Sequence, residues 1–132
     1  MRTTLLALAV LACGCAPPIK NVPMAEIPKL TKLDDVMDVQ ATLADPQFKK
    51  IGAASYSDAD WAAFADAAER IGATSAKIKD FSKGAGFDAL AMQLKDKAAA
   101  LGTAASAKDA SAASRALAEM KATCKECHSK FR

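Results

Sequence analysis

The chain ends in a cysteine pair followed by a histidine, in the run Cys124-Lys125-Glu126-Cys127-His128. On an α-helix, residues three and four apart share a face, so these two cysteines and the histidine would project together. Cysteines at this spacing can each form a thioether to a haem vinyl group, and the adjacent histidine can then ligate the iron. His128 is also the single histidine of the chain. The motif therefore predicts one covalently attached haem, haem c, with His128 as an axial iron ligand.

Two other chemistries use such cysteines. A thiol-disulfide redox pair usually sits at a helix N-terminus next to a βαβ pattern, and the sequence contains no such pattern. A structural zinc site needs about four ligands. Only Cys124, Cys127 and His128 are close together, because Cys13 and Cys15 lie far away near the N-terminus. Covalent haem is the favoured interpretation.

The composition agrees with a large internal cofactor. Hydrophobic residues make up 52% of the chain, but much of this is alanine, and aromatic residues make up only 5%. Alanine favours helices and close backbone approach while contributing little apolar area. A helical domain of this kind lacks bulk at its centre, and a macrocycle inserted among the helices would supply it.

Charge and motifs argue against several other functions. The net charge is only +3, and the sequence contains neither a phosphate-binding glycine loop nor a basic aromatic platform, so we expect no nucleic-acid partner. The carboxylates are scattered, and no second histidine is present to act as a base. We therefore expect that the protein is not an enzyme.

The N-terminus predicts export from the cytoplasm. Residues 1–14 read as an export signal, with Arg2 before a short apolar run, and Leu-Ala-Cys-Gly-Cys resembles the lipobox of bacterial lipoproteins. Cys15 is the preferred lipidation candidate and Cys13 the second, while an ordinary secretory peptide is the alternative. Residues 15–28 contain four prolines and predict an extended tether. We expect a periplasmic protein whose contact with a membrane is an N-terminal lipid anchor.

Four amphipathic segments follow, and their periodicity predicts helices. The first covers about Ile27 to Leu43 and closes at Asp45-Pro46, and a loop leads to Tyr56. The remaining helices are expected from Ser57 to Ile78, from Phe87 to Leu101, and from Lys108-Asp109 to Phe131, with a turn at Gly102 to Ala107. Short connections favour an all-α, antiparallel up-down-up-down four-helix bundle over residues 29–132, with the haem inside it.

From about Leu30 to Arg132, the chain resembles the class II c-type cytochromes, the cytochrome c′ and cytochrome c-556 group. The resemblance rests on the motif lying at the very C-terminus and on the Phe131-Arg132 ending, an aromatic and a basic residue. A second similarity is the methionine of the first helix, Met37, which precedes the Asp45-Pro46 turn. In the c-556-like branch this methionine is the sixth iron ligand, whereas in cytochrome c′ an apolar residue leaves the iron five-coordinate.

The resemblance implies two candidate functions. With Met37 as second axial ligand, the protein carries single electrons between redox partner proteins. If Met37 is instead ordinary core filling, as methionines at helical spacing often are, the open site binds a diatomic gas, nitric oxide or carbon monoxide. Lys121, Lys125, Lys130 and Arg132 surround the motif and either steer an acidic partner or form a solvated face. Relatives of this kind often dimerise, so a homodimer is also expected.

Overall fold

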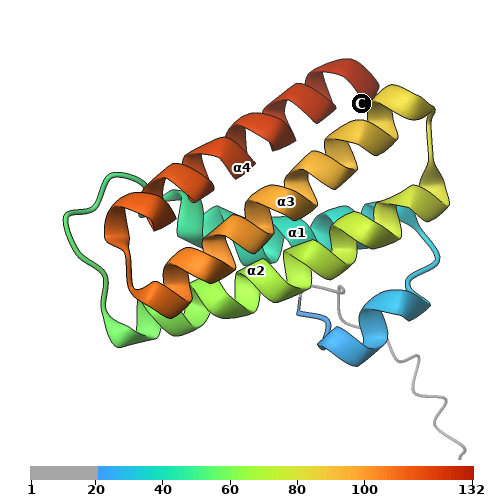
Figure 1. Cartoon of the computed structure of the whole chain (residues 1–132). Helices are drawn as coiled ribbons and strands as arrows, with labels where there is room; N and C mark the ends of the chain where they lie inside the picture. Colours follow the sequence, from blue (N-terminus) through green and yellow to red (C-terminus); the bar gives the residue numbers. More distant parts are fainter. Residues whose placement is uncertain (1–20) are drawn as a thin grey trace, which may run out of the picture.

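The computed structural model describes residues 21–132, which form helices and their connections (Figure 1). In chain order these are a 3-10 helix η1 (Met24–Lys29), α1 (Leu33–Phe48), α2 (Asp58–Ile78), a 3-10 turn η2 (Lys79–Phe81), α3 (Ala85–Ala107) and α4 (Ala110–Phe131). Successive α-helices run in opposite directions, and α1 lies behind the layer of α2, α3 and α4 in this view. No strand occurs in residues 21–132, which confirms the all-α prediction.

The predicted export signal and both lipidation candidates, Cys13 and Cys15, lie outside the described residues. Among the helices that are described, none has the length and apolar character needed to cross a membrane.

The start of α2 shows how local sequence sets a helix boundary. Ser57 is the N-cap, and its side chain accepts a hydrogen bond from the backbone N–H of Asp60 at 3.2 Å. The Asp60 carboxylate in turn accepts from the backbone N–H of Ser57 at 2.9 Å, which completes a capping box. Two backbone donors that a helix end leaves unpaired are thereby satisfied. The predicted start of this helix is confirmed, and its last residue, Ile78, is the last residue of the predicted apolar stripe.

The core combines an aromatic cluster at one end of the bundle with many buried alanines. Tyr56, Trp61 and the fully buried Phe64 meet edge to face where α2 begins, with ring centroids 4.9 to 5.7 Å apart. Many of the other buried positions of α2, α3 and α4 are alanines: Ala67, Ala68, Ala91, Ala98, Ala104, Ala105, Ala113 and Ala116. Such small side chains let α2, α3 and α4 pack closely.

The third helix is longer than predicted. The expected turn at Gly102 to Ala107 is wrong, because α3 continues to Ala107 and ends at Lys108, whose φ of 52° is left-handed. Gly102 is accommodated in the helix because α2 approaches it closely: a Cβ placed there would lie 3.3 Å from the Cβ of Ala68. The glycine therefore serves packing here and does not end the helix.

The first helix is shifted toward the C-terminus relative to the prediction. It begins at Leu33, and Pro46 lies inside it, so the expected stop at Asp45-Pro46 is wrong. A proline within a helix removes one hydrogen bond and crowds the preceding turn. Burial of Gln47 and packing of Phe48 against the core offset that cost, and α1 continues to Phe48.

The described part of the expected tether, residues 21–28, is not an extended spacer. Residues 24–28 belong to the 3-10 helix η1, and the side chains of Ile27 and Val22 are buried. Arg70 on α2 secures this segment by donating to Asn21 Oδ1 at 2.6 Å and to the carbonyl of Val22 at 3.1 Å. The packed domain therefore begins near residue 21, before the predicted boundary at residue 29.

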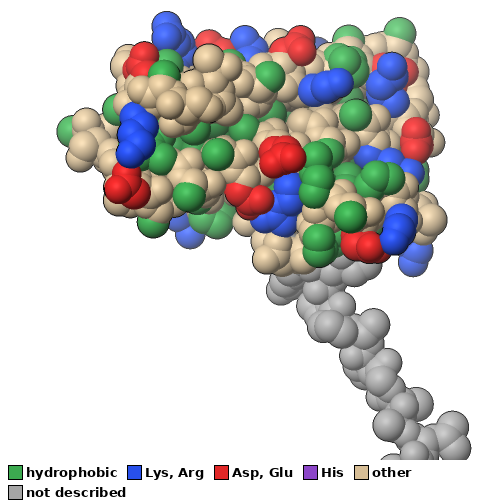
Figure 2. Space-filling view, turned by 60° about the horizontal axis from the view of Figure 1, so that its bottom comes forward, with side chains coloured by type: hydrophobic (Ala, Val, Ile, Leu, Met, Phe, Trp, Pro, Cys, Tyr) green, Lys and Arg blue, Asp and Glu red, His purple; other side chains and the backbone are tan. Residues whose placement is uncertain are grey.

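Charged side chains of both signs are interspersed on the face shown in Figure 2. Several ion pairs join residues that are close in sequence, such as Lys29 with Glu26 and Lys77 with Asp80, each at 2.8 Å. Exposed pairs of this kind contribute little to stability. The fold therefore depends mainly on helix packing and capping.

We predict that Asp60 makes stability depend on acid pH. A hydrogen bond from Lys50, followed by those from Ser57, lowers the pKa of Asp60 from 3.8 to about 2. A lowered folded-state pKa adds stability above pH 3.8, and this stability is lost as pH falls toward about 2. In thermal unfolding, Asp60→Asn should lower the midpoint at neutral pH, and this deficit should shrink as pH falls through about 2. Asp96→Asn, at an exposed site on α3, is the control, and an equal D60N deficit at both pH values would contradict the assignment.

Candidate functional site

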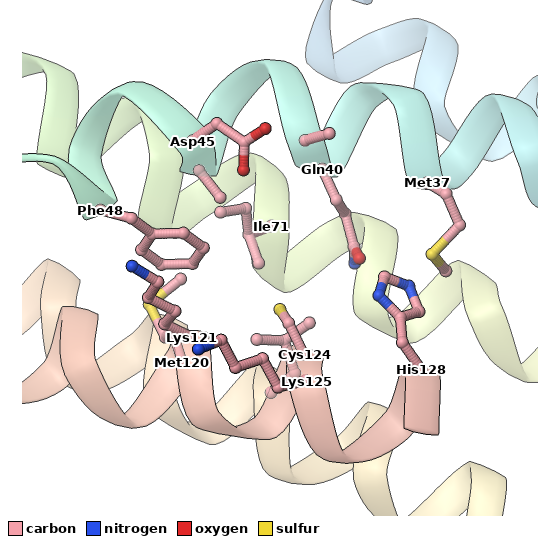
Figure 3. Close-up of a pocket in the computed structure, with 13 residues that line it drawn as sticks. Met37, Gln40, Asp45, Phe48, Ile71, Met120, Lys121, Cys124, Lys125 and His128 are labelled. Carbon is pink, nitrogen blue, oxygen red and sulfur yellow. The ribbon is translucent and has the colours of Figure 1, made fainter. Parts of the chain in front are cut away.

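A cavity of about 240 Å³ lies between α1 and α4 (Figure 3). These two helices pack little against each other, whereas α2 packs closely on α3 and α3 on α4. Two further hollows of about 30 and 660 Å³ adjoin it and share lining residues with it. We call the three hollows together the α1–α4 slot, and we call the hollow of about 240 Å³, which Figure 3 shows, the main cavity. Its first hollow is lined by Met37, Gln40, Ala41, Ala44, Asp45, Phe48, Ile71, Leu94, Met120, Lys121, Cys124, Lys125 and His128.

The structure brings the three residues of the C-terminal motif to this slot. Cys124, Cys127 and His128 all lie on α4, and all three line the smaller hollow next to the main cavity. Helical spacing therefore has the effect that the sequence predicts, because one face of α4 presents two sulfurs and an imidazole to the same space.

The last turn of α4 is held in place by the segment around the start of α3. The Phe131 ring packs edge-on against Phe87, with centroids 5.4 Å apart. Lys83 donates from Nζ to the carbonyl of Phe131 at 2.9 Å. These contacts hold the helix end that carries Cys127 and His128, so the aromatic residue after the motif has a positioning role.

The surroundings of Cys124 and Cys127 favour the protonated form of both thiols. Burial raises the pKa of Cys124 to about 11, with smaller contributions from Cys127 and Asp45. Burial also raises the pKa of Cys127, although Lys83 opposes that shift. Redox-active and metal-binding cysteines act as thiolates, and raised pKa values disfavour that form at neutral pH. Within residues 21–132, no three His, Cys, Asp or Glu side chains are grouped to hold a metal ion.

Met37 faces the slot from the opposite helix. It lies on α1, and together with His128 it lines all three hollows. Figure 3 shows the Met37 thioether and the His128 ring both extending into the space between α1 and α4. Met92, which has similar helical spacing, is not among the residues that line the slot.

The residues present fit a covalent haem. Two thiols suit its vinyl groups, while an imidazole and a thioether form an axial ligand pair found in c-type cytochromes. The walls between them are largely apolar, with Ile71, Leu94 and Met120 among them. Three of these four side chains come from α4, and the fourth, Met37, comes from the facing helix α1. A flat group between the two helices could therefore reach all four.

The charged side chains at the slot are of two kinds. From the α4 side, Lys121 and Lys125 line the main cavity, and Arg132 lines the largest hollow. Lys130, also predicted for this cluster, pairs instead with Glu126 at 2.6 Å. From the α1 side come carboxylates of Asp34, Asp38 and Asp45. The edge of the slot is therefore basic along α4 and acidic along α1.

Sequence reasoning gave no role to Gln40, the polar side chain at the middle of the slot. Gln40 is 8% exposed, and its Nε2 donates to Thr74 at 3.2 Å and to Ser75 at 3.4 Å. Its position three residues after Met37 is the signal that places it on the same helix face. The partners on α2 are 34 and 35 residues away in sequence, so periodicity alone did not predict the hydrogen bonds.

A helical bundle whose internal cavity is faced by a C-x-x-C-H motif defines a haem-binding protein of the c type. A sequence model described as Cytochrome C' matches residues 29–132. The chain belongs to the cytochrome c′ family. Searches of curated proteins and of solved structures found no match.

We predict that filling the slot from α1 blocks haem incorporation. Ala44 is 6% exposed and lines the main cavity, so Ala44→Phe should occupy space that the macrocycle needs. After expression with a haem-maturation system, the ratio of haem absorbance to protein should fall severalfold. Ala62→Phe, at an exposed position of α2, should keep the parent ratio. Full haem content in A44F would show that the cofactor lies elsewhere.

Proposed function

We propose that this protein is a periplasmic c-type cytochrome that carries single electrons through one covalent haem. In this proposal Cys124 and Cys127 form the thioethers, His128 is one axial iron ligand and Met37 is the other. The observation that carries it is that Met37 and His128, on opposite helices, share every hollow of the slot. A thioether opposite an imidazole favours an electron carrier over a gas-binding site, which needs an open position.

The chain's own residues have separate tasks. A haem held here would supply an iron centre that gains and loses one electron. His128 and Met37 come from rigid helices, so little protein movement is needed when the charge changes. Leu94 and Met120 give the slot apolar walls, and burial of the cofactor together with its axial ligands sets the potential.

Export and partner choice are parts of the same proposal. Members of this family are typically periplasmic, which agrees with the export signal expected in residues 1–14. We propose that acylation of Cys15, or of Cys13, anchors the protein to a membrane. The partners are redox proteins that dock at the slot edge and meet Lys121 and Lys125 with acidic groups.

We predict that Met37 controls access of carbon monoxide to the iron. The reduced parent protein should show no prompt change in its Soret band when carbon monoxide is added. Met37→Ala removes the sixth ligand, so the same addition should produce a large, rapid change. Met92→Ala truncates a methionine of α3 that lies outside the slot, and it should behave as the parent does.

Two outcomes contradict this assignment. If the parent binds carbon monoxide as fast as M37A, the position is open and the protein is a gas-binding cytochrome c′. If the ferric and ferrous spectra of M37A equal those of the parent, Met37 does not ligate the iron.

We also predict that the haem is attached through Cys124 and Cys127. The intact mass of the exported parent should exceed that of the processed polypeptide, together with its lipid where it is acylated, by one haem, and denaturation should not remove the haem. Cys124→Ala with Cys127→Ala should reduce the covalent haem to nothing, while Ser129→Ala on the same helix should retain it. A parent mass equal to that of the bare polypeptide would refute covalent attachment.

A further inference from the structure

Gln40 is fixed in one orientation by the helix it faces. Its Nε2 lies 3.2 Å from Thr74 Oγ1 and 3.4 Å from Ser75 Oγ, and both of these residues are fully buried. Thr74 already uses its hydroxyl hydrogen, because Oγ1 donates to the backbone carbonyls of Arg70 at 2.9 Å and Ile71 at 3.1 Å.

A threonine hydroxyl has one hydrogen to donate, so toward Gln40 the Thr74 oxygen can only accept. The side of the amide that faces Thr74 must therefore be the NH₂ group. Turning the amide over would bring its oxygen against the lone pairs of Thr74 Oγ1, which is unfavourable in a buried network. Thr74 therefore determines which end of the Gln40 amide is left for the slot.

That remaining end is the carbonyl oxygen, Oε1. Gln40 lines the two hollows that also contain Cys124 and His128, and Figure 3 shows its amide directed from α1 into the slot. Among the described residues, no donor is hydrogen-bonded to Oε1. An acceptor oxygen is thus held in a space whose other nearby walls are largely apolar.

We propose that Gln40 lowers the midpoint potential of the haem directly, by aiming the negative end of its amide dipole at the slot. The proposal rests on the proposed function, because it requires a redox-active haem there. The oxidised haem carries one more positive charge than the reduced haem. A fixed negative dipole end in a low-dielectric cavity therefore stabilises the oxidised state.

The test is redox titration of the exported, haem-loaded protein and of Gln40→Leu. This substitution keeps a side chain of similar size and removes the dipole, so the midpoint potential should rise. The optical spectra of both redox states should keep the parent's ligand signature. An unchanged potential in Q40L would overturn the proposal, and so would a changed ligand signature, because Gln40 would then act by holding Met37 in place.

Gln47 provides a matched control on the same helix. It is also 8% exposed, but its Oε1 accepts from Lys50 at 2.9 Å and it lies outside the slot. Gln47→Leu should leave the potential at the parent value, and an equal rise in both variants would overturn a specific role for Gln40. Thr74→Val keeps Gln40 but removes the acceptor that orients its amide and leaves only the longer contact to Ser75, so the potential should rise by less than in Q40L. A potential equal to the parent's would show that Thr74 does not orient the dipole.

These measurements distinguish the two proposals. If the parent contains no covalent haem, the proposed function fails before any potential is measured. If the parent titrates as a one-electron carrier and Q40L has the parent potential, only the role of Gln40 fails.

Discussion

The separation of α1 from α4 is the constraint on which the rest of the structure depends. A four-helix bundle normally buries each helix against two neighbours, but here α1 packs mainly on α2, and α4 packs mainly on α3. The space left between α1 and α4 would be an unfavourable cavity in a protein that used only its side chains as core. A large apolar group bound between the two helices would fill this space and remove the cost of the cavity.

The small side chains of the bundle have a related role. Alanines such as Ala98 and Ala113 let α2, α3 and α4 pack closely as one layer. The aromatic cluster around Phe64 closes one end, and Phe87 with Phe131 closes the region beside the motif. Side chains of α2, α3 and α4 thus fill the space among these three helices, and the slot beside α1 is left for the cofactor.

Helix α1 contributes both polar and apolar side chains to the slot. One helical turn carries Met37 and Gln40, the first a soft thioether and the second an amide held by Thr74. The same helix contributes carboxylates to the slot edge, such as Asp45, whereas α4 contributes lysines. The two helices that border the slot therefore give it chemically different sides, and a cofactor between them experiences both.

Local patterns predicted much of this molecule. Helical periodicity and capping residues such as Ser57 determined the all-α class and the start of α2, and the spacing of Cys124 and His128 determined that they share a face. Tertiary structure alone decided that α3 continues through Gly102 and that α1 continues through Pro46, because packing against neighbouring helices outweighs the local preference of glycine and proline. It also decided the surroundings of Gln40, since hydrogen bonds between helices distant in sequence leave no trace in local periodicity.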